Sequence, residues 1–131
     1  LAGLADATHK FESRYNDIII GPYPEAKALY HERSPIHHTD RLNTPVIFFQ
    51  GIEDRVVPMA QTEMMVSALH DRGIRVAVQY FAGEQHGFRQ SSTIENCLHN
   101  ELTFYSLVLD LDGAEESGPL HFRGDIELSN M

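Results

Sequence analysis

The sequence predicts an α/β fold in the form of a partial three-layer sandwich with a short parallel sheet. Three observations lead to this class. A run of β-branched and aromatic residues from Pro45 to Gln50 ends at Gly51, which is typical of a strand buried on both faces. A second strand is expected at Ile74–Phe81, and the stretch between the two strands has helical spacing. The order strand–helix–strand indicates a βαβ unit, in which the strands are parallel and the crossover is right-handed.

The part of the chain before the first strand is expected to be mainly helical. Leu1–Ile20 has the apolar spacing of a helix in two pieces, with Thr8 as the N-cap of the second. Pro24 is placed at the start of a short helical stretch, Glu25–Glu32, where proline is tolerated. Residues 36–44 are polar, and we expect them to be irregular or to form a short helical turn.

Two longer helices are predicted around the second strand. Pro58 opens the first, which runs to about Arg72, and Gly73 is well placed to end it. Its apolar stripe consists of Met64, Met65, Ala68 and Leu69. The second helix is expected from about Ser92 to Leu111. Its apolar residues also recur at helical spacing, at Ile94, Leu98, Leu102, Tyr105 and Leu109.

The chain divides into one folded unit and a tail. A length of 131 residues suits a single domain. Residues 1–111 carry all of the helix and strand patterns, whereas residues 112–131 mix glycine, serine, proline and acidic residues with short apolar islands. We expect this tail to be disordered or to dock on another surface. The chain starts without methionine inside a helical pattern, so we expect that a segment upstream of it has been removed.

Composition limits the partners and the compartment. The formal net charge of −9 argues against nucleic acid or an anionic membrane as a partner. No stretch approaches the roughly 20 apolar residues of a membrane helix, and the N-terminus lacks the pattern of a signal peptide. Cys97 is the single cysteine, which is compatible with a reducing compartment, and we expect a cytoplasmic location.

The predicted strand order brings two reactive side chains to one edge of the sheet. Catalytic residues of open α/β sheets lie in loops beyond the carboxyl ends of the strands. Asp54 follows the first strand and His86 follows the second, so we expect them to lie close together. The carboxylate would accept the imidazole Nδ1–H and stabilise the imidazolium that forms when the other nitrogen takes a proton. Gly83 and Gly87 bracket His86 and permit the tight turns that this placement needs.

The order of the two residues agrees with one arrangement of a catalytic triad. In α/β-hydrolases the chain order is Ser, Asp, His, and the serine lies in a Gly-x-Ser-x-Gly turn before both partners. Asp54 precedes His86, but no serine of the chain has glycine two residues before and two residues after it. We therefore expect the chain to lack the nucleophile and to be inactive alone.

Two segments resemble a known family. Asn43–Pro58 contains the pattern Gly-x-x-Asp-x-x-Val-Pro, and Tyr80–Phe88 contains a later His-Gly-Phe. Together they resemble the acid and histidine loops of the prolyl oligopeptidase family of serine peptidases, especially its dipeptidyl-aminopeptidase and acylaminoacyl-peptidase branches. The resemblance covers about residues 1–111. It implies that residues 1–111 are the C-terminal part of a peptidase catalytic domain with a partial α/β-hydrolase fold. It also implies Asp54 as the triad acid, His86 as the general base and a peptide substrate for the full-length protein.

Simpler interpretations of these residues stay open. Asp54 can be a turn former or a helix cap, and His86 a loop histidine without a role. His37 and His38 suggest a metal site, but adjacent residues rarely bind one ion together and no cysteine or carboxylate has helpful spacing. We therefore expect no metal and no cofactor.

The alternatives for function are an esterase or dienelactone-hydrolase-like enzyme, and a non-catalytic assembly module with the same fold. The Asp and His loops alone do not separate them. A sheet this short leaves strand edges and apolar faces uncovered. We therefore expect the chain to self-associate or to dock on the missing N-terminal half of its domain.

Overall fold

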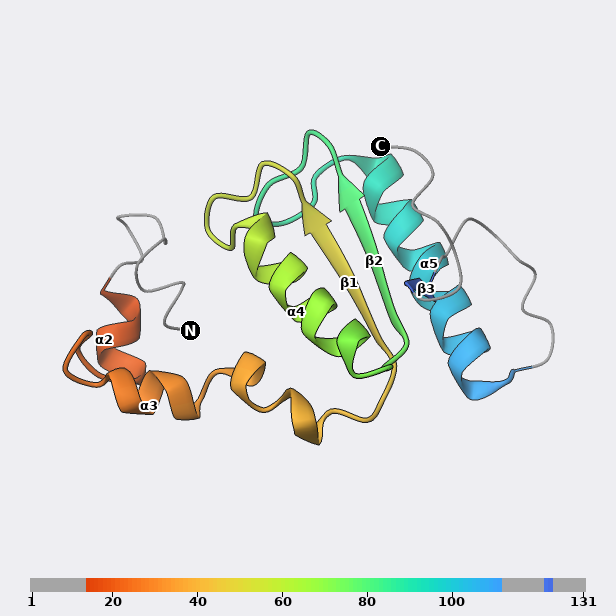
Figure 1. Cartoon of the computed structure of the whole chain (residues 1–131). Coiled ribbons are helices and arrows are strands. Elements are labelled where there is room, and N and C mark those ends of the chain that lie inside the picture. The colour runs from red at the N-terminus through yellow and green to blue at the C-terminus, as the bar shows by residue number, and fades with distance from the viewer. Residues whose placement is uncertain (1–13, 112–121, 124–131) are drawn as a thin grey trace.

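The computed structural model describes residues 14–111 and the backbone of residues 122–123. Its helices and strands follow one another in the order shown in Figure 1. The elements are α2 (Tyr15–Ile19), α3 (Lys27–Glu32), the 3-10 turns η1 (Pro35–His37) and η2 (Thr39–Arg41), β1 (Val46–Gly51), α4 (Met59–Asp71), β2 (Val76–Phe81), α5 (Ser91–Leu109) and β3 (Phe122–Arg123). None of the described helices has the length and apolar character needed to span a lipid bilayer.

The sheet has the strand order β1-β2-β3. β1 and β2 are parallel, with a register that runs from Val46 opposite Val76 to Gly51 opposite Phe81. This pairing confirms the predicted βαβ unit. β3 pairs with β2 in the antiparallel direction, so the third strand comes from the segment that the sequence suggested as a tail. The rest of that predicted tail lies outside the described residues.

α4 and α5 cover opposite faces of the parallel strands. α4 packs against the side chains at even-numbered positions of β1 and β2, namely Val46, Phe48, Val76 and Val78. On this face Val66 and Leu69 of α4 and Val76 of β2 are fully buried together. The side chain of Asn100 on α5 donates a hydrogen bond to Gln79, an odd-numbered position of β2. Side chains alternate between the faces of a strand, so the two helices lie on different sides, as Figure 1 also shows. The partial three-layer α/β arrangement is thereby formed.

The end of α4 has the geometry that the sequence predicted. Gly73 has a φ of 71°, which places it in the left-handed region that favours glycine. Its N–H donates to His70 O at 2.8 Å, and the next N–H, of Ile74, donates to Leu69 O at 3.1 Å. These two bonds form a Schellman motif, which ends the helix and turns the chain into β2. Within the helix, Leu69 is buried as predicted, whereas Met64 is exposed because Val66 takes the place against the sheet.

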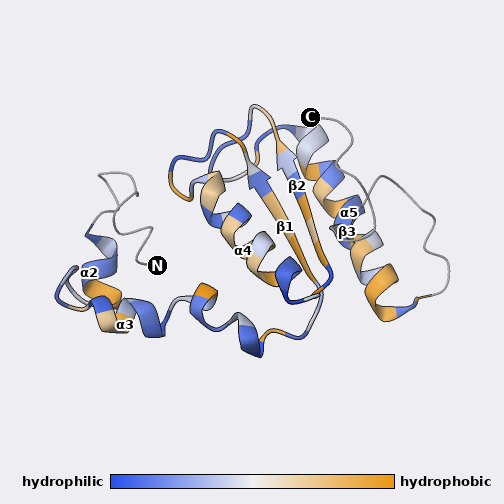
Figure 2. Ribbon diagram, viewed as in Figure 1, coloured by the Kyte–Doolittle hydropathy of each residue, from blue (hydrophilic) through white to orange (hydrophobic). Residues whose placement is uncertain are grey.

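α5 is a helix as predicted, but its apolar stripe does not face the sheet. Ile94, Leu98, Leu102, Tyr105 and Leu109 are 44 to 62 % exposed. Most of the buried residues of α5 are small or polar: Thr93, Asn100, Thr103, Phe104 and Ser106. Figure 2 shows hydrophobic residues along β1 and β2 and again at several positions along α5. An apolar helix face is therefore left without a cover among the described residues.

The N-terminal segment is held by side-chain hydrogen bonds to the backbone. Tyr30 is fully buried, and its hydroxyl donates to Gly21 O at 3.0 Å. Arg72, at the end of α4, donates to Leu42 O at 2.9 Å and to Asp40 O at 3.1 Å. The first part of the predicted helix at residues 1–20 lies outside the described residues. Pro24 precedes α3 instead of opening it, because the helix begins at Lys27.

Candidate active site

Asp54 lies in the loop after β1, and its carboxylate closes that loop. The N–H groups of Val56 and Val57 both donate to Oδ1 at 2.8 Å. The other oxygen, Oδ2, lies 3.0 Å from Nδ1 of His86. Burial raises the pKa of the Asp54 carboxyl, but the hydrogen bonds from Val57, His86 and Val56 outweigh it, so the pKa lies below its ordinary value. The carboxylate is thus held in its charged form as an acceptor.

His86 reaches Asp54 from the loop after β2. The side chain of His86 is 56 % exposed, whereas that of Asp54 is 8 % exposed. A charged carboxylate can only accept, so Nδ1 is the donor of this bond, and in the neutral form of the ring Nε2 carries the lone pair. Gly83 has a φ of 77° and Gly87 a φ of 97°, so both flanking turns use backbone that favours glycine. The parallel strands place the two side chains at one edge of the sheet, as their topology predicted.

The two loops touch through their backbones. Glu53 N–H donates to Glu84 O at 3.0 Å, and Ile52 N–H donates to Phe81 O at 3.0 Å. Gly51 makes this contact possible, because a Cβ atom there would lie 2.5 Å from Gln85 O and 2.6 Å from Glu84 O. The glycine at the end of β1 therefore sets how closely the Asp54 loop approaches the His86 loop.

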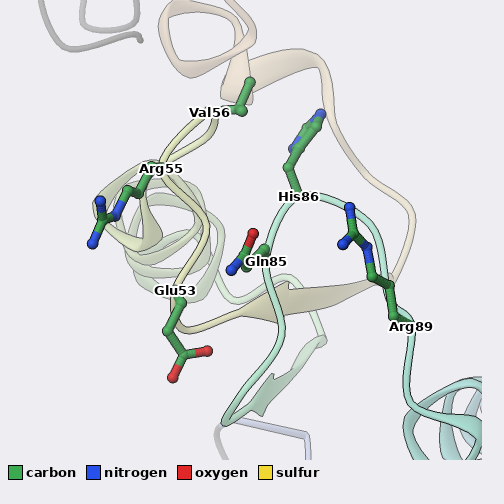
Figure 3. A pocket seen from close by; sticks show the side chains of 6 residues that line it. All are labelled: Glu53, Arg55, Val56, Gln85, His86 and Arg89. Atoms are coloured by element: carbon green, nitrogen blue, oxygen red, sulfur yellow. The ribbon is translucent and has the colours of Figure 1, made fainter.

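An open hollow of about 550 Å³ adjoins the Asp–His pair. It is lined by Glu53, Arg55, Val56, Gln85, His86 and Arg89. Figure 3 shows Arg55 and Arg89 on either side of His86, one from each loop. The exposed His86 ring thus lies beside an open space whose lining residues are mostly polar or charged.

A buried amide that the sequence did not single out supports the acid loop. Gln50 accepts a hydrogen bond from Thr62 Oγ1 at 2.6 Å and donates to Gly51 O at 2.9 Å and to Val57 O at 3.2 Å. These bonds tie both ends of the Asp54 loop to α4. The signal available in the sequence was a polar residue at the end of an otherwise apolar strand.

The histidines that suggested a metal site do not gather ligands. The rings of His31 and His37 stack with their centroids 3.6 Å apart, face to face. Across residues 14–111 no group of three or more histidine, cysteine or acidic side chains could hold an ion. Cys97 is partly buried, and burial, with Glu84 and Glu101 as lesser causes, raises the pKa of its thiol. A raised thiol pKa does not favour a cysteine nucleophile.

Comparison with known proteins shows the family of the chain. Residues 3–112 match the model of the prolyl oligopeptidase family. The chain belongs to the prolyl oligopeptidase family. This membership, together with the parallel strand pair and its flanking helices, confirms the predicted partial α/β-hydrolase fold.

Individual relatives agree with this family. The chain is 31 % identical over 93 residues to dipeptidyl aminopeptidase BIII of Pseudoxanthomonas mexicana, a match over 71 % of this chain and 13 % of the relative. It is 30 % identical over 82 residues to the acylamino-acid-releasing enzyme of Arabidopsis thaliana, which covers 63 % of this chain and 10 % of that enzyme.

Solved structures give a closer match. A puromycin-hydrolyzing peptidase of Mycobacterium tuberculosis is 45 % identical with a TM-score of 0.80, over 83 % of this chain and 17 % of that one. A puromycin hydrolase is 40 % identical, also with a TM-score of 0.80, over 84 % of this chain and 17 % of that one. The chain thus spans between 10 and 17 % of the length of these four proteins.

Proposed function

We propose that this chain supplies the acid and the general base of a serine peptidase triad, with Asp54 as the acid and His86 as the base. The distance of 3.0 Å between His86 Nδ1 and Asp54 Oδ2 carries the proposal. The Asp54–His86 pair lies at the carboxyl edge of a parallel sheet, where catalytic groups of such folds are found. Membership of a peptidase family supports hydrolysis of an amide bond.

The hydrogen-bond directions suit general base catalysis. With Nδ1–H directed to Asp54, Nε2 of His86 takes the proton of a serine hydroxyl as the serine oxygen attacks the substrate carbonyl. The Asp54 carboxylate stabilises the imidazolium. When the C–N bond breaks, Nε2 gives its proton to the leaving amine and an acyl-enzyme remains. His86 then takes a proton from water, which attacks the acyl carbonyl, and returns a proton to the serine as the acid is released.

The nucleophile in this proposal comes from a part of the protein beyond these 131 residues. The serines of the chain are at positions 13, 34, 67, 91, 92, 106, 117 and 129, and none lies in a Gly-x-Ser-x-Gly sequence. A serine without that sharp turn lacks the exposed position that the fold gives its nucleophile. We infer that the chain alone is inactive and acts within a longer protein.

The substrate we propose is a peptide or a peptide-like amide. The relatives are named as a dipeptidyl aminopeptidase, an acylamino-acid-releasing enzyme and a puromycin-hydrolyzing peptidase. The hollow beside His86 is lined by charged side chains from both loops, which suits the polar backbone of a peptide. No metal or cofactor takes part in the proposed steps.

The partner we propose is the N-terminal half of the same catalytic domain, or a second copy of the chain when that half is absent. Two surfaces support this. The stripe on α5 is apolar and exposed, and β1 lies at the edge of the described sheet. Such surfaces are rarely left uncovered in a soluble protein. A chain that is strictly monomeric and does not bind the added N-terminal half would contradict this proposal.

Replacing His86 with alanine in the full-length protein tests the function. We expect hydrolysis of an aminoacyl amide, and labelling of the serine by a fluorophosphonate probe, to fall by at least about 10³-fold without loss of folding. The control is His70→Ala, because His70 is 43 % exposed and lies near the end of α4, away from the carboxyl edge of the strands. Retained hydrolysis in His86→Ala would reject the assignment. Hydrolysis of esters but not amides by the wild type would favour the esterase alternative.

A further inference from the structure

Glu84 is a buried acidic residue two positions before His86. It is only 2 % exposed, although it lies in the loop between β2 and α5. A charged group is costly to bury unless hydrogen bonds satisfy it. The proposed proton transfers do not involve Glu84, so its burial needs a separate explanation.

The carboxylate of Glu84 closes the His86 loop. Oε2 accepts from Arg89 N–H and Oε1 accepts from Gln90 N–H, both at 2.9 Å. The Thr93 side chain also donates to it. All three donors follow His86 in the chain, whereas the acceptor precedes it. The segment that bears His86 is therefore clamped at both ends by one side chain.

The start of α5 strengthens this clamp. Gln90 is the N-cap residue of a 19-residue helix, and Thr93 lies in its first turn. The free N–H groups at a helix start attract a negative charge. Burial raises the pKa of Glu84, but the bonds from Arg89, Gln90 and Thr93 outweigh it and leave the pKa below its ordinary value. The carboxylate thus stays charged and connects the His86 loop to the start of a 19-residue helix.

The backbone of the same residue holds the other loop. Glu84 O accepts from Glu53 N–H at 3.0 Å, next to Asp54. Gly51 allows this approach, because any Cβ atom there would collide with Glu84 O and Gln85 O. Glu84 is therefore bonded to both segments that bear the Asp–His pair.

We propose that Glu84 is a positioning residue, whose side chain and carbonyl together set the distance and orientation between His86 and Asp54. The proposal rests on the catalytic roles proposed above. Glu84 does not belong to the lining of the hollow beside His86, and it takes no part in the proposed proton transfers. It acts through the loop, by restricting where the His86 ring can lie relative to the Asp54 carboxylate.

The test is Glu84→Gln, which keeps the size of the side chain but removes the charge and one of the two acceptor oxygens. In the full-length protein we expect kcat to fall about 10- to 100-fold, because a small misplacement of a catalytic group has an effect of that size. KM should stay within about twofold, since no substrate contact is lost. In the 131-residue chain, the low-field NMR signal of the proton between His86 Nδ1 and Asp54 should broaden or disappear.

The control is Glu95→Gln, an exposed position on α5, which should keep both kcat and the NMR signal. Thr93→Val, which removes one donor to Glu84, serves if Glu84→Gln does not fold, and should lower kcat several-fold in the same direction. Wild-type kcat and an unchanged NMR signal in folded Glu84→Gln would overturn the positioning role. If His86→Ala still loses activity in that case, the proposed catalytic function of the Asp–His pair stands. Retained activity in His86→Ala would instead reject the proposed function, whatever Glu84 does.

Discussion

Replacing Gly51 with alanine tests whether the Asp–His pair depends on the close approach of the two loops. Gly51 ends β1, and an added Cβ atom would lie 2.5 Å from Gln85 O and 2.6 Å from Glu84 O. Both neighbours are backbone atoms, which cannot rotate away as a flexible side chain does. Ordinary contact begins at 3.4 Å, so the loops must separate by about 0.9 Å.

This separation acts directly on the bond between Asp54 and His86. Their nitrogen and oxygen are 3.0 Å apart, and a donor and acceptor 3.6 Å apart no longer form a hydrogen bond. We expect the free energy of unfolding to fall by about 1 to 3 kcal/mol, which is the usual cost of overpacking. We expect kcat in the full-length protein to fall about 100-fold, because a misplacement of about 1 Å at a catalytic group has that effect.

The assay combines urea unfolding of the chain with kcat measured on the full-length protein. Gly73→Ala is the matched control, because Gly73 has a φ of +71° and nothing within 4 Å of its added Cβ. It should lower stability by about 1 to 2 kcal/mol through its left-handed backbone and leave kcat unchanged. Unchanged kcat in Gly51→Ala, or an equal loss of kcat in Gly73→Ala, would refute the reasoning.

Two further substitutions test the charge of the pair and the apolar stripe. Asp54→Asn should lower kcat by about 10⁴-fold. Hydrogen bonds overcome the burial effect and hold the Asp54 pKa below its ordinary 3.8. The stabilisation from this carboxylate is therefore complete well above pH 3.8 and is lost as the pH falls through the lower folded value. Urea unfolding should show the difference between wild type and variant shrinking over that range, and a constant difference down to pH 2 would contradict this. Leu102→Lys changes a side chain that is 62 % exposed, so the stability of the chain should change by less than about 0.5 kcal/mol. Sedimentation should nevertheless show weaker self-association or weaker binding of the N-terminal half, and unchanged association would exclude this stripe as the contact.

Local sequence patterns predicted the elements that carry the site. The apolar run before Gly51 and most of the predicted segment Ile74–Phe81 were found as strands in the structure. Gly73 ends α4 as expected. These features follow from rules that span only a few residues, namely side-chain alternation, helical spacing and the backbone freedom of glycine. Because parallel strands share one carboxyl edge, the same patterns also predicted that Asp54 and His86 would meet.

The supporting residues could not be predicted in this way. The buried Gln50 amide is satisfied by Thr62, which lies on α4. The buried Glu84 carboxylate is satisfied by donors that face it only after the loop has closed around His86. A hydrogen bond needs both partners within a few tenths of an ångström of the right place. No periodicity in the sequence contains that information.

The sequence alone determined the class of the fold, the order of its central strand–helix–strand unit and the identity of the two side chains at its edge. These depend on the character of consecutive residues. The tertiary structure decided which side of α5 meets the sheet, how β3 pairs and how closely the two loops approach. Spacing marks one side of α5 as apolar but does not say which side will be covered. The buried side of α5 carries Thr93, Asn100, Thr103 and Phe104, and its Asn100 bonds to Gln79 of β2, whereas the side bearing Leu98 and Leu102 is left exposed. Whether the apolar side of α5 is buried depends on which surfaces are available for packing, and these surfaces form only when the elements come together in space.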